Sequence, residues 1–392
     1  MSLSSLVSSQ QAWLFVGLLF WQSGFAFVAS LGTHLLHWSW DSLFASLFFA
    51  LSQIPLSCAL WRLVADAWRR PSRQSPPKLL NVVLPVVRQV IYAMATCTTG
   101  ALAGAAASAH PRAGAAACLL WFYRRRAHLS CAHVPVVNVS RWRHVKASLP
   151  SAAREALVCA LAVGAASTLL GRGPFRSTFT ALIVVLCADI GRVLAYVVRL
   201  EPHRLDVSTS DDDRMKPFVS TPLAAALSSE PAVGDGAAAI ARILAYRDFA
   251  TKCEQSLSWR SSNVFTRGSW DPACAAAMCA PRALAKQLKE SPSRQPGACD
   301  AVAASYGARA AASLCRASLR EDVLGLAQLS KDESVALVMK QLREMLALVA
   351  QAQRVVKSET TGSSPQLDSL ADELTLAVGT ILEAFRGCDL SL

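Results

Sequence analysis

Four charged residues lie within or beside long apolar segments of the chain, where a charged side chain is costly and often functional: Arg88, Glu155, Asp189 and Arg192. A proton or substrate relay through a membrane would use such residues. Asp189 and Arg192 are three residues apart, so on one helix they share a face and can form an ion pair. One pair and one separate arginine do not make a pathway. We therefore predict a structural intramembrane pair, Asp189–Arg192.

Sequence motifs for nucleophilic, phosphate or metal chemistry do not occur in the chain. It contains no GxxxxGK(S/T), HExxH or GxSxG pattern. The closest cysteines of the second half, Cys274 and Cys279, have the wrong spacing for a zinc ribbon or finger. Every histidine lies at or before His203, so the second half has no imidazole for a zinc site or a catalytic dyad. We predict no catalytic, cofactor-binding or metal site, and cysteines that are small core residues of a reduced compartment.

One histidine and one aspartate stand at a spacing that resembles acid/base chemistry. His37 and Asp41, in the segment HWSWD, are four residues apart near an expected membrane surface. They resemble the His and Asp of membrane acyltransferases, but the spacing is one residue short of that pattern and no partner block follows. We assign no catalysis to them and predict that the protein is not an enzyme.

The composition points to a membrane protein. Only 17% of the 392 residues are charged, against about 25% in a typical soluble domain. Residues 1–200 carry a net charge of +14 and the remaining residues −2, so the basic residues belong to the apolar half. Lysine and arginine in such a half mark cytosolic loops, and we therefore expect a lipid bilayer as partner, with no direct nucleic acid and no small-molecule substrate.

Apolar runs predict about six membrane-spanning helices within a transmembrane domain of residues 1–200. A run of about 20 apolar residues is long enough to cross the hydrocarbon layer. The first run lacks the basic segment of a signal peptide and is too long to be one. We predict spans at 12–31, 43–61, 82–102, 105–123, 152–170 and 179–198.

Charge in the connecting segments sets the expected orientation. Span four is short, and its start depends on a tight turn at His110–Arg112. With six spans, the loops 65–79 and 124–151 face one side and carry ten basic residues, against three on the other side. Because cytosolic loops retain Lys and Arg, both termini are expected in the cytosol. Gly100 and Gly104 form a GxxxG motif that allows two helix backbones to approach closely.

The second half is expected to be a polar linker, 201–236, followed by a cytosolic α-helical domain, 237–392. Apolar residues three and four apart predict helices from Ala239 to about Trp259, over 274–289 and over 298–329. Two further apolar stripes predict a helical hairpin. The first has seven residues from Val335 to Val356 and follows a capping box at Ser330 and Glu333. The second has six residues from Leu367 to Phe385 and follows a turn in which Ser364 is the expected N-cap and Pro365 the first helical residue. No strand pattern occurs here, so the predicted class is all-α throughout.

This layout resembles the nuclear division cycle (NDC-type) transmembrane nucleoporins, which scaffold the membrane ring of the nuclear pore complex. The family has a helix with an aromatic residue and an aspartate, then a basic position before a hydrophobe–Phe pair, then a tryptophan that opens the next helix. The matching residues here are Tyr246, Asp248, Arg260, Val264, Phe265 and Trp270. The segment 326–357 is similar to the penultimate helix of the family, and 367–386 stands where the family ends. The linker is shorter than in many members.

The resemblance implies a non-enzymatic scaffold in the nuclear envelope that anchors soluble nucleoporins and assists pore assembly. Its expected partners are nucleoporins of the membrane ring and linker nucleoporins. Tyr246, Asp248, Trp259, Arg260, Phe265 and Trp270 are the candidate partner-binding residues, and we expect the loop from Trp259 to Trp270 to be exposed. The alternative is a polytopic transporter or membrane-bound lipid-modifying enzyme with a helical regulatory domain.

Overall fold

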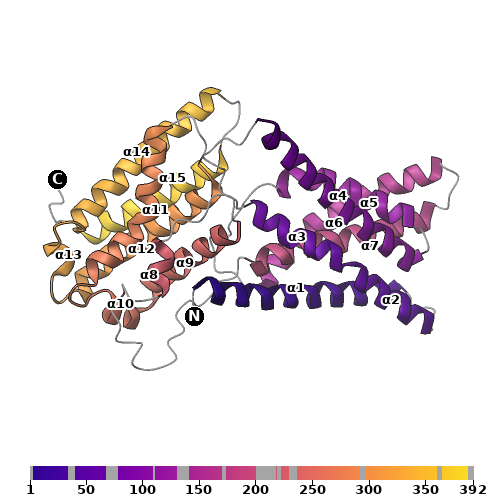
Figure 1. Cartoon of the computed structure of the whole chain (residues 1–392), viewed down its shortest axis with the longest axis horizontal. Coiled ribbons are helices and arrows are strands. Elements are labelled where there is room, and N and C mark those ends of the chain that lie inside the picture. Colours follow the sequence, from indigo (N-terminus) through magenta and orange to yellow (C-terminus); the bar gives the residue numbers. More distant parts are fainter. Residues whose placement is uncertain are drawn as a thin grey trace. The chain divides into compact units, whose positions relative to one another are not determined.

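A computed structural model describes residues 3–33, 40–67, 78–108, 111–129, 141–169, 174–199, 218, 222–228, 236–291, 296–359 and 364–386. All regular structure in these ranges is helical, which confirms the all-α prediction (Figure 1). The chain divides into two compact units, one between Ser8 and Glu201 and one made mainly of residues from Pro202 on. This division coincides with the predicted boundary at about residue 200.

The first unit contains seven described helices, and each predicted apolar segment lies in one helix or one helix pair: α1 (Leu3–Thr33), α2 (Trp40–Ser52), α3 (Ile54–Ala67), α4 (Lys78–Ser108), α5 (Pro111–Leu129), α6 (Arg141–Leu169) and α7 (Pro174–Arg199). The segment 43–61 is divided between α2 and α3, which meet at Gln53. Pro55 lacks the N–H that a continuous helix would need there, and this explains the interruption.

Four stretches of these helices are long and apolar enough to cross a membrane: Gln11–Val28, Leu43–Val64, Lys146–Leu169 and Phe175–Val198. The other two predicted spans, 82–102 and 105–123, lie mainly in α4 and α5 and are not among these four. In α4 the side chains of residues 78–86 and of Arg88 lie outside the described residues, and α5 carries a run of three arginines near its end. By length and composition, these four stretches are candidate membrane spans, which is typical of a multi-pass membrane protein.

Two predicted boundaries in this unit are wrong. α4 continues to Ser108 and α5 begins at Pro111, so 105–108 belong to the third apolar segment and not the fourth. Proline suits the first position of a helix because the missing N–H has no intrahelical partner there. α6 begins at Arg141, so the last part of the expected loop 124–151 is helical.

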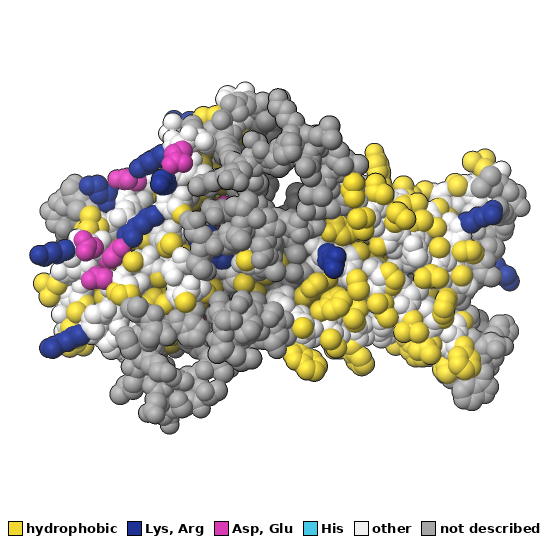
Figure 2. Space-filling view, viewed as in Figure 1, with side chains coloured by type: hydrophobic (Ala, Val, Ile, Leu, Met, Phe, Trp, Pro, Cys, Tyr) yellow, Lys and Arg dark blue, Asp and Glu magenta, His cyan; other side chains and the backbone are white. Residues whose placement is uncertain are grey.

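Small residues allow α4 and α5 to pack closely. A Cβ atom at Gly100 would collide with the carbonyl oxygen of Gly114, and one at Gly114 would collide with that of Gly100 and lie 3.0 Å from the Cα of Gly104. The GxxxG prediction is thus confirmed, with Gly114 of α5 as the partner. Figure 2 shows hydrophobic side chains over most of the visible face of this unit. Among the exposed ones are Trp13, Phe20, Trp21, Val28 and Met94, and such a surface suits contact with lipid.

The second unit contains α8 (Pro222–Ser228), α9 (Gly236–Gln255), α10 (Leu257–Asn263), α11 (Trp270–Glu290), α12 (Ala298–Glu321), α13 (Leu326–Leu329), α14 (Val335–Glu359) and α15 (Pro365–Ala384). α12 lies at its centre and packs against α9, α11 and α15 (Figure 1). Alanine and glycine make this close packing possible: a Cβ atom at Gly307 would collide with the carbonyl oxygen of Ala277 in α11.

The predicted hairpin is confirmed as α14 and α15. The seven predicted stripe residues of α14 and the six of α15 are all buried: Val335, Val338, Leu342, Met345, Val349, Ala352, Val356, Leu367, Leu370, Leu374, Val378, Ile381 and Phe385. Ser364 is the N-cap residue before Pro365, as expected, although its hydroxyl makes no capping hydrogen bond. The Ser330 hydroxyl accepts the N–H of Glu333 at 2.8 Å, but α14 begins only at Val335.

Three other predictions for this half are wrong. Part of the expected linker is helical, because Leu223 and Leu227 of α8 bury their side chains against neighbouring helices. The helix expected to reach Trp259 is interrupted at Ser256, and Leu257 is exposed rather than part of the buried stripe. The helix expected over 298–329 ends at Glu321, before a turn in which Gly325 has a φ of +66°. Left-handed backbone of this kind favours glycine.

Candidate functional site

The predicted pair in α7 is present at the centre of a larger charged cluster. Asp189 is fully buried, and its Oδ1 lies 3.0 Å from the Nε of Arg192. Arg125 of α5 donates to both carboxylate oxygens, at 3.1 and 3.2 Å. The indole of Trp121, also from α5, donates to Oδ1 at 3.0 Å. The prediction of the pair is confirmed, and its partners from α5 were not foreseen.

A second ion pair lies on the same helix as Arg125. Arg124 donates to the Glu155 carboxylate of α6 at 2.9 and 3.3 Å, in a more exposed position. Ion pairs therefore hold five charged side chains and join α5, α6 and α7: Arg124, Arg125, Glu155, Asp189 and Arg192. Charge-assisted contacts of this geometry are strong and directional, so they suit architecture better than proton movement. The side chain of Arg88 lies outside the described residues.

The candidate residues on α9 have partners inside the second unit. Tyr246 is fully buried; its hydroxyl lies 3.3 Å from the carbonyl oxygens of Leu227 and Ala276 and accepts the Ala280 N–H at 3.2 Å. Burial raises the pKa of this phenol well above its usual value. Asp248, nearly buried, forms an ion pair with Lys252 at 2.9 Å. Tyr246 therefore joins α9 to α8 and α11, whereas the Asp248–Lys252 pair lies within α9.

The aromatic candidates after α9 are largely core residues. Trp259 is half-buried and stands edge-on to Phe218 and Phe249, with ring centroids 6.2 and 5.9 Å away. Phe265 stacks on Trp270, and the Trp270 indole donates to the Glu333 carbonyl at 2.9 Å. Both Phe265 and Trp270 are buried. The expectation of two exposed tryptophans is wrong, because Trp270 opens α11 facing the start of α14 and not solvent.

Arg260 of α10 is likewise buried. Its guanidinium donates to both carboxylate oxygens of Glu321, at 2.9 and 2.5 Å, and to the carbonyl of Cys253 at 2.8 Å. The Glu321 contacts raise the pKa of Arg260, so it remains charged. No sequence pattern pointed to this partner, which is 61 residues away. Expecting Arg260 to be an exposed interface anchor was therefore wrong.

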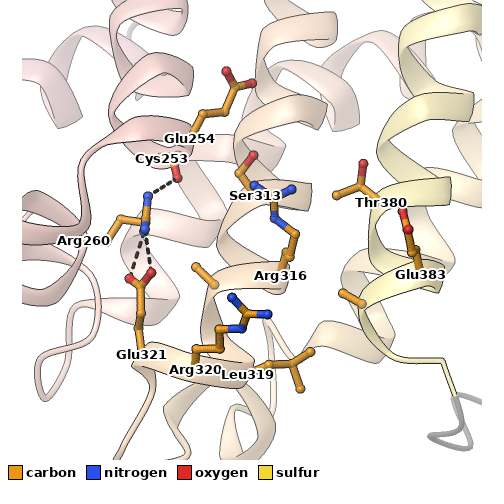
Figure 3. Close-up of a pocket in the computed structure, with 12 residues that line it drawn as sticks. Cys253, Glu254, Arg260, Ser313, Arg316, Leu319, Arg320, Glu321, Thr380 and Glu383 are labelled. Atoms are coloured by element: carbon orange, nitrogen blue, oxygen red, sulfur yellow. Dashed lines mark hydrogen bonds and ion pairs between the residues drawn. The ribbon is translucent and has the colours of Figure 1, made fainter.

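A pocket of about 560 Å³ opens beside this ion pair, between α9, α12 and α15 (Figure 3). Glu321 and Glu254, two of its carboxylates, are occupied by Arg260 and Arg309 respectively. Arg316, Arg320 and Glu383 also line it, are exposed, and have no ion-pair partner in the described part of the chain.

The charged side chains that line the pocket suit the binding of a charged group. Ser313 lies in its wall, but residues from Arg204 on include no histidine to activate a hydroxyl. Burial raises the pKa of the Cys253 thiol well above its usual value, so its thiolate is disfavoured. The described residues contain no group of three or more His, Cys, Asp or Glu side chains suited to a metal. Ten cysteines are described as free thiols, and most are buried.

The remaining sequence candidate for chemistry is not placed. His37 and the side chain of Asp41 lie outside the described residues. Comparison with models of known protein families gives no match, and comparison with curated protein sequences gives none either.

Proposed function

We propose that the protein is a multi-pass membrane scaffold whose C-terminal helical bundle assembles with other proteins. The observation that supports this proposal most is that the buried carboxylate of the first unit is paired with partners from neighbouring positions and helices. Asp189, the fully buried carboxylate of α7, is held by Arg125, Arg192 and Trp121. A transporter needs polar groups that change partners along a path. Here the charged and polar side chains around Asp189 join α5 to α7, and such fixed contacts suit a membrane anchor.

The setting that we propose is the membrane ring of the nuclear pore complex, with both termini in the cytosol and six spans. This rests on the resemblance carried by Tyr246, Asp248, Arg260, Phe265 and Trp270. All but Arg260 contribute to aromatic or polar contacts of the α9–α11 region, and Arg260 joins α10 to α12. In this view the similar residues preserve a bundle that presents other surfaces to soluble nucleoporins.

Affinity purification of the full chain tests the proposal. A tagged copy is extracted from its native cells in mild detergent, and a tagged reticulum protein with several spans is processed in parallel as the control. We expect nucleoporins in the first sample and not in the second. Recovery of reticulum proteins alone, without nucleoporins, contradicts the proposal.

A further inference from the structure

An exposed aliphatic surface lies at the end of α12, and we call it the 319–329 tip. Val323 is 93% exposed and Leu329 78%, and Leu319 and Leu324 are also exposed. A Cβ atom at Gly325 would lie 3.8 Å from the Cδ1 of Leu329, so Leu329 is beside the turn that carries Val323 and Leu324. Large aliphatic side chains concentrated in so short a segment mark an interaction surface.

The turn at this tip has a defined shape. The Asp322 carboxylate accepts the N–H of Ala327 at 2.8 Å, and the Asp322 carbonyl accepts the N–H of Gly325 at 3.3 Å. The left-handed conformation of Gly325 then directs the chain into α13. The polar backbone of the turn is thus partly satisfied internally while Val323 and Leu324 remain outside. Presenting aliphatic side chains in this way requires no unfolding.

Two arginines without an ion-pair partner in the described part of the chain belong to or adjoin the tip. Arg316 and Arg320 are one helical turn apart on α12, and both are exposed without an ion-pair partner in the described part of the chain. Figure 3 shows them with Leu319 along the same end of α12, facing the space between α12 and α15. The nearby acid Glu321 is neutralised by Arg260, and Asp322 is engaged with the turn. Glu383, across the pocket, is the opposing unpaired acid.

We propose that the 319–329 tip is a membrane-contact site. Val323 and Leu324 enter the interface of a bilayer, while Arg316 and Arg320 contact the phosphates of anionic headgroups. Aliphatic side chains beside free cations match the boundary between acyl chains and anionic headgroups. Four stretches of the same chain are long and apolar enough to cross a membrane, so the second unit is tethered to a bilayer when they do. This inference does not depend on the nuclear pore setting.

The test uses the full chain in vesicles. Val323→Cys is labelled with an environment-sensitive NBD dye and reconstituted into phosphatidylcholine vesicles with or without phosphatidylserine. Each preparation includes lipid carrying a doxyl quencher on its acyl chain. Leu376→Cys, at an exposed leucine of α15, is the matched control, and the unsubstituted chain labelled in parallel gives the background from native cysteines.

We expect the dye at position 323 to shift to the blue and to be quenched by doxyl lipid, more strongly with phosphatidylserine, while the dye at position 376 is not. Arg316→Gln with Arg320→Gln should lower the quenching to its value in neutral vesicles. Equal quenching at 323 and 376 overturns the proposal. So does a blue shift at 323 without doxyl quenching, because it means burial against protein, such as a second copy. An unchanged response after both arginine substitutions overturns the headgroup assignment.

Discussion

Arg260 and Glu321 form a two-contact ion pair that joins α10 to the end of α12, at N–O distances of 2.9 and 2.5 Å. Both side chains are about nine-tenths buried. The pair therefore fixes the position of α10, of one wall of the pocket and of the turn that follows α12.

Removing one member of this pair should destabilise the second unit. Arg260→Ala leaves the Glu321 carboxylate buried without its counter-charge, at a cost of about 3–5 kcal/mol. Thermal unfolding of the detergent-solubilised chain, followed by circular dichroism, measures the change. Arg316→Ala removes an exposed arginine from the same pocket and should change the midpoint little. Similar midpoints for both variants contradict the importance assigned to the pair.

The carboxylate of Asp189 is expected to matter more than that of Glu155. Asp189→Asn leaves Arg125 and Arg192 without a negative partner between helices, so we expect a loss of about 3–5 kcal/mol and a low yield of monodisperse protein. Glu155→Gln breaks the more exposed pair with Arg124 and should cost about 0–1 kcal/mol. Fluorescence-detected size exclusion after a heating series compares the two variants. A more damaging Glu155→Gln would reverse our ranking.

The close contact between Gly100 of α4 and Gly114 of α5 predicts that replacing glycine by alanine has opposite effects on stability at two positions of the chain. Gly114→Ala drives a methyl group into the Gly100 carbonyl and should cost about 1–3 kcal/mol. Gly17→Ala in α1 meets nothing within 4 Å, and alanine is favoured over glycine in a helix by about 1 kcal/mol. We expect the first variant to melt below the native chain in detergent and the second at or above it. Equal melting temperatures would show that the close approach is unimportant.

The buried carboxyl of Glu373 predicts a pH dependence. Burial raises its pKa above the ordinary value of 4.5, partly offset by Arg309. The folded state then binds its proton more tightly than the unfolded state, so this group's contribution to stability falls as the pH rises above 4.5. Glu373→Gln should raise the melting temperature at pH 7, with a smaller gain below pH 4.5. Glu383→Gln, at an exposed glutamate, is the control, and a destabilised Glu373→Gln at pH 7 contradicts this reasoning.

The parts of the fold that the sequence predicts best are those with long periodic stripes. Val338, Leu342 and Met345 recur three or four residues apart, and this spacing places them on one face of a helix whatever surrounds it. The interruptions were not predictable in the same way. Ser256 and Gly325 end or divide helices within segments whose apolar content continues, because neighbouring helices determine where the chain must turn.

The residues of the candidate site were likewise only partly predictable from the sequence. The Asp189–Arg192 pair follows from a spacing of three on one helix, but Arg125 and Trp121 reach Asp189 only because α5 packs on α7. Arg260 and Trp270 look like exposed anchors when their neighbours in sequence are considered alone. Their partners, Glu321 and the Glu333 carbonyl, are more than 60 residues away and become visible only in three dimensions.

Imaging of a fluorescently tagged full-length copy, expressed from its own promoter in living cells, tests the central proposal most directly. A membrane scaffold of the nuclear pore should give a punctate nuclear rim that coincides with a soluble nucleoporin marker. Such a pattern is what we predict. A uniform reticular or plasma-membrane distribution, with no enrichment at the nucleoporin marker, would contradict the proposed function.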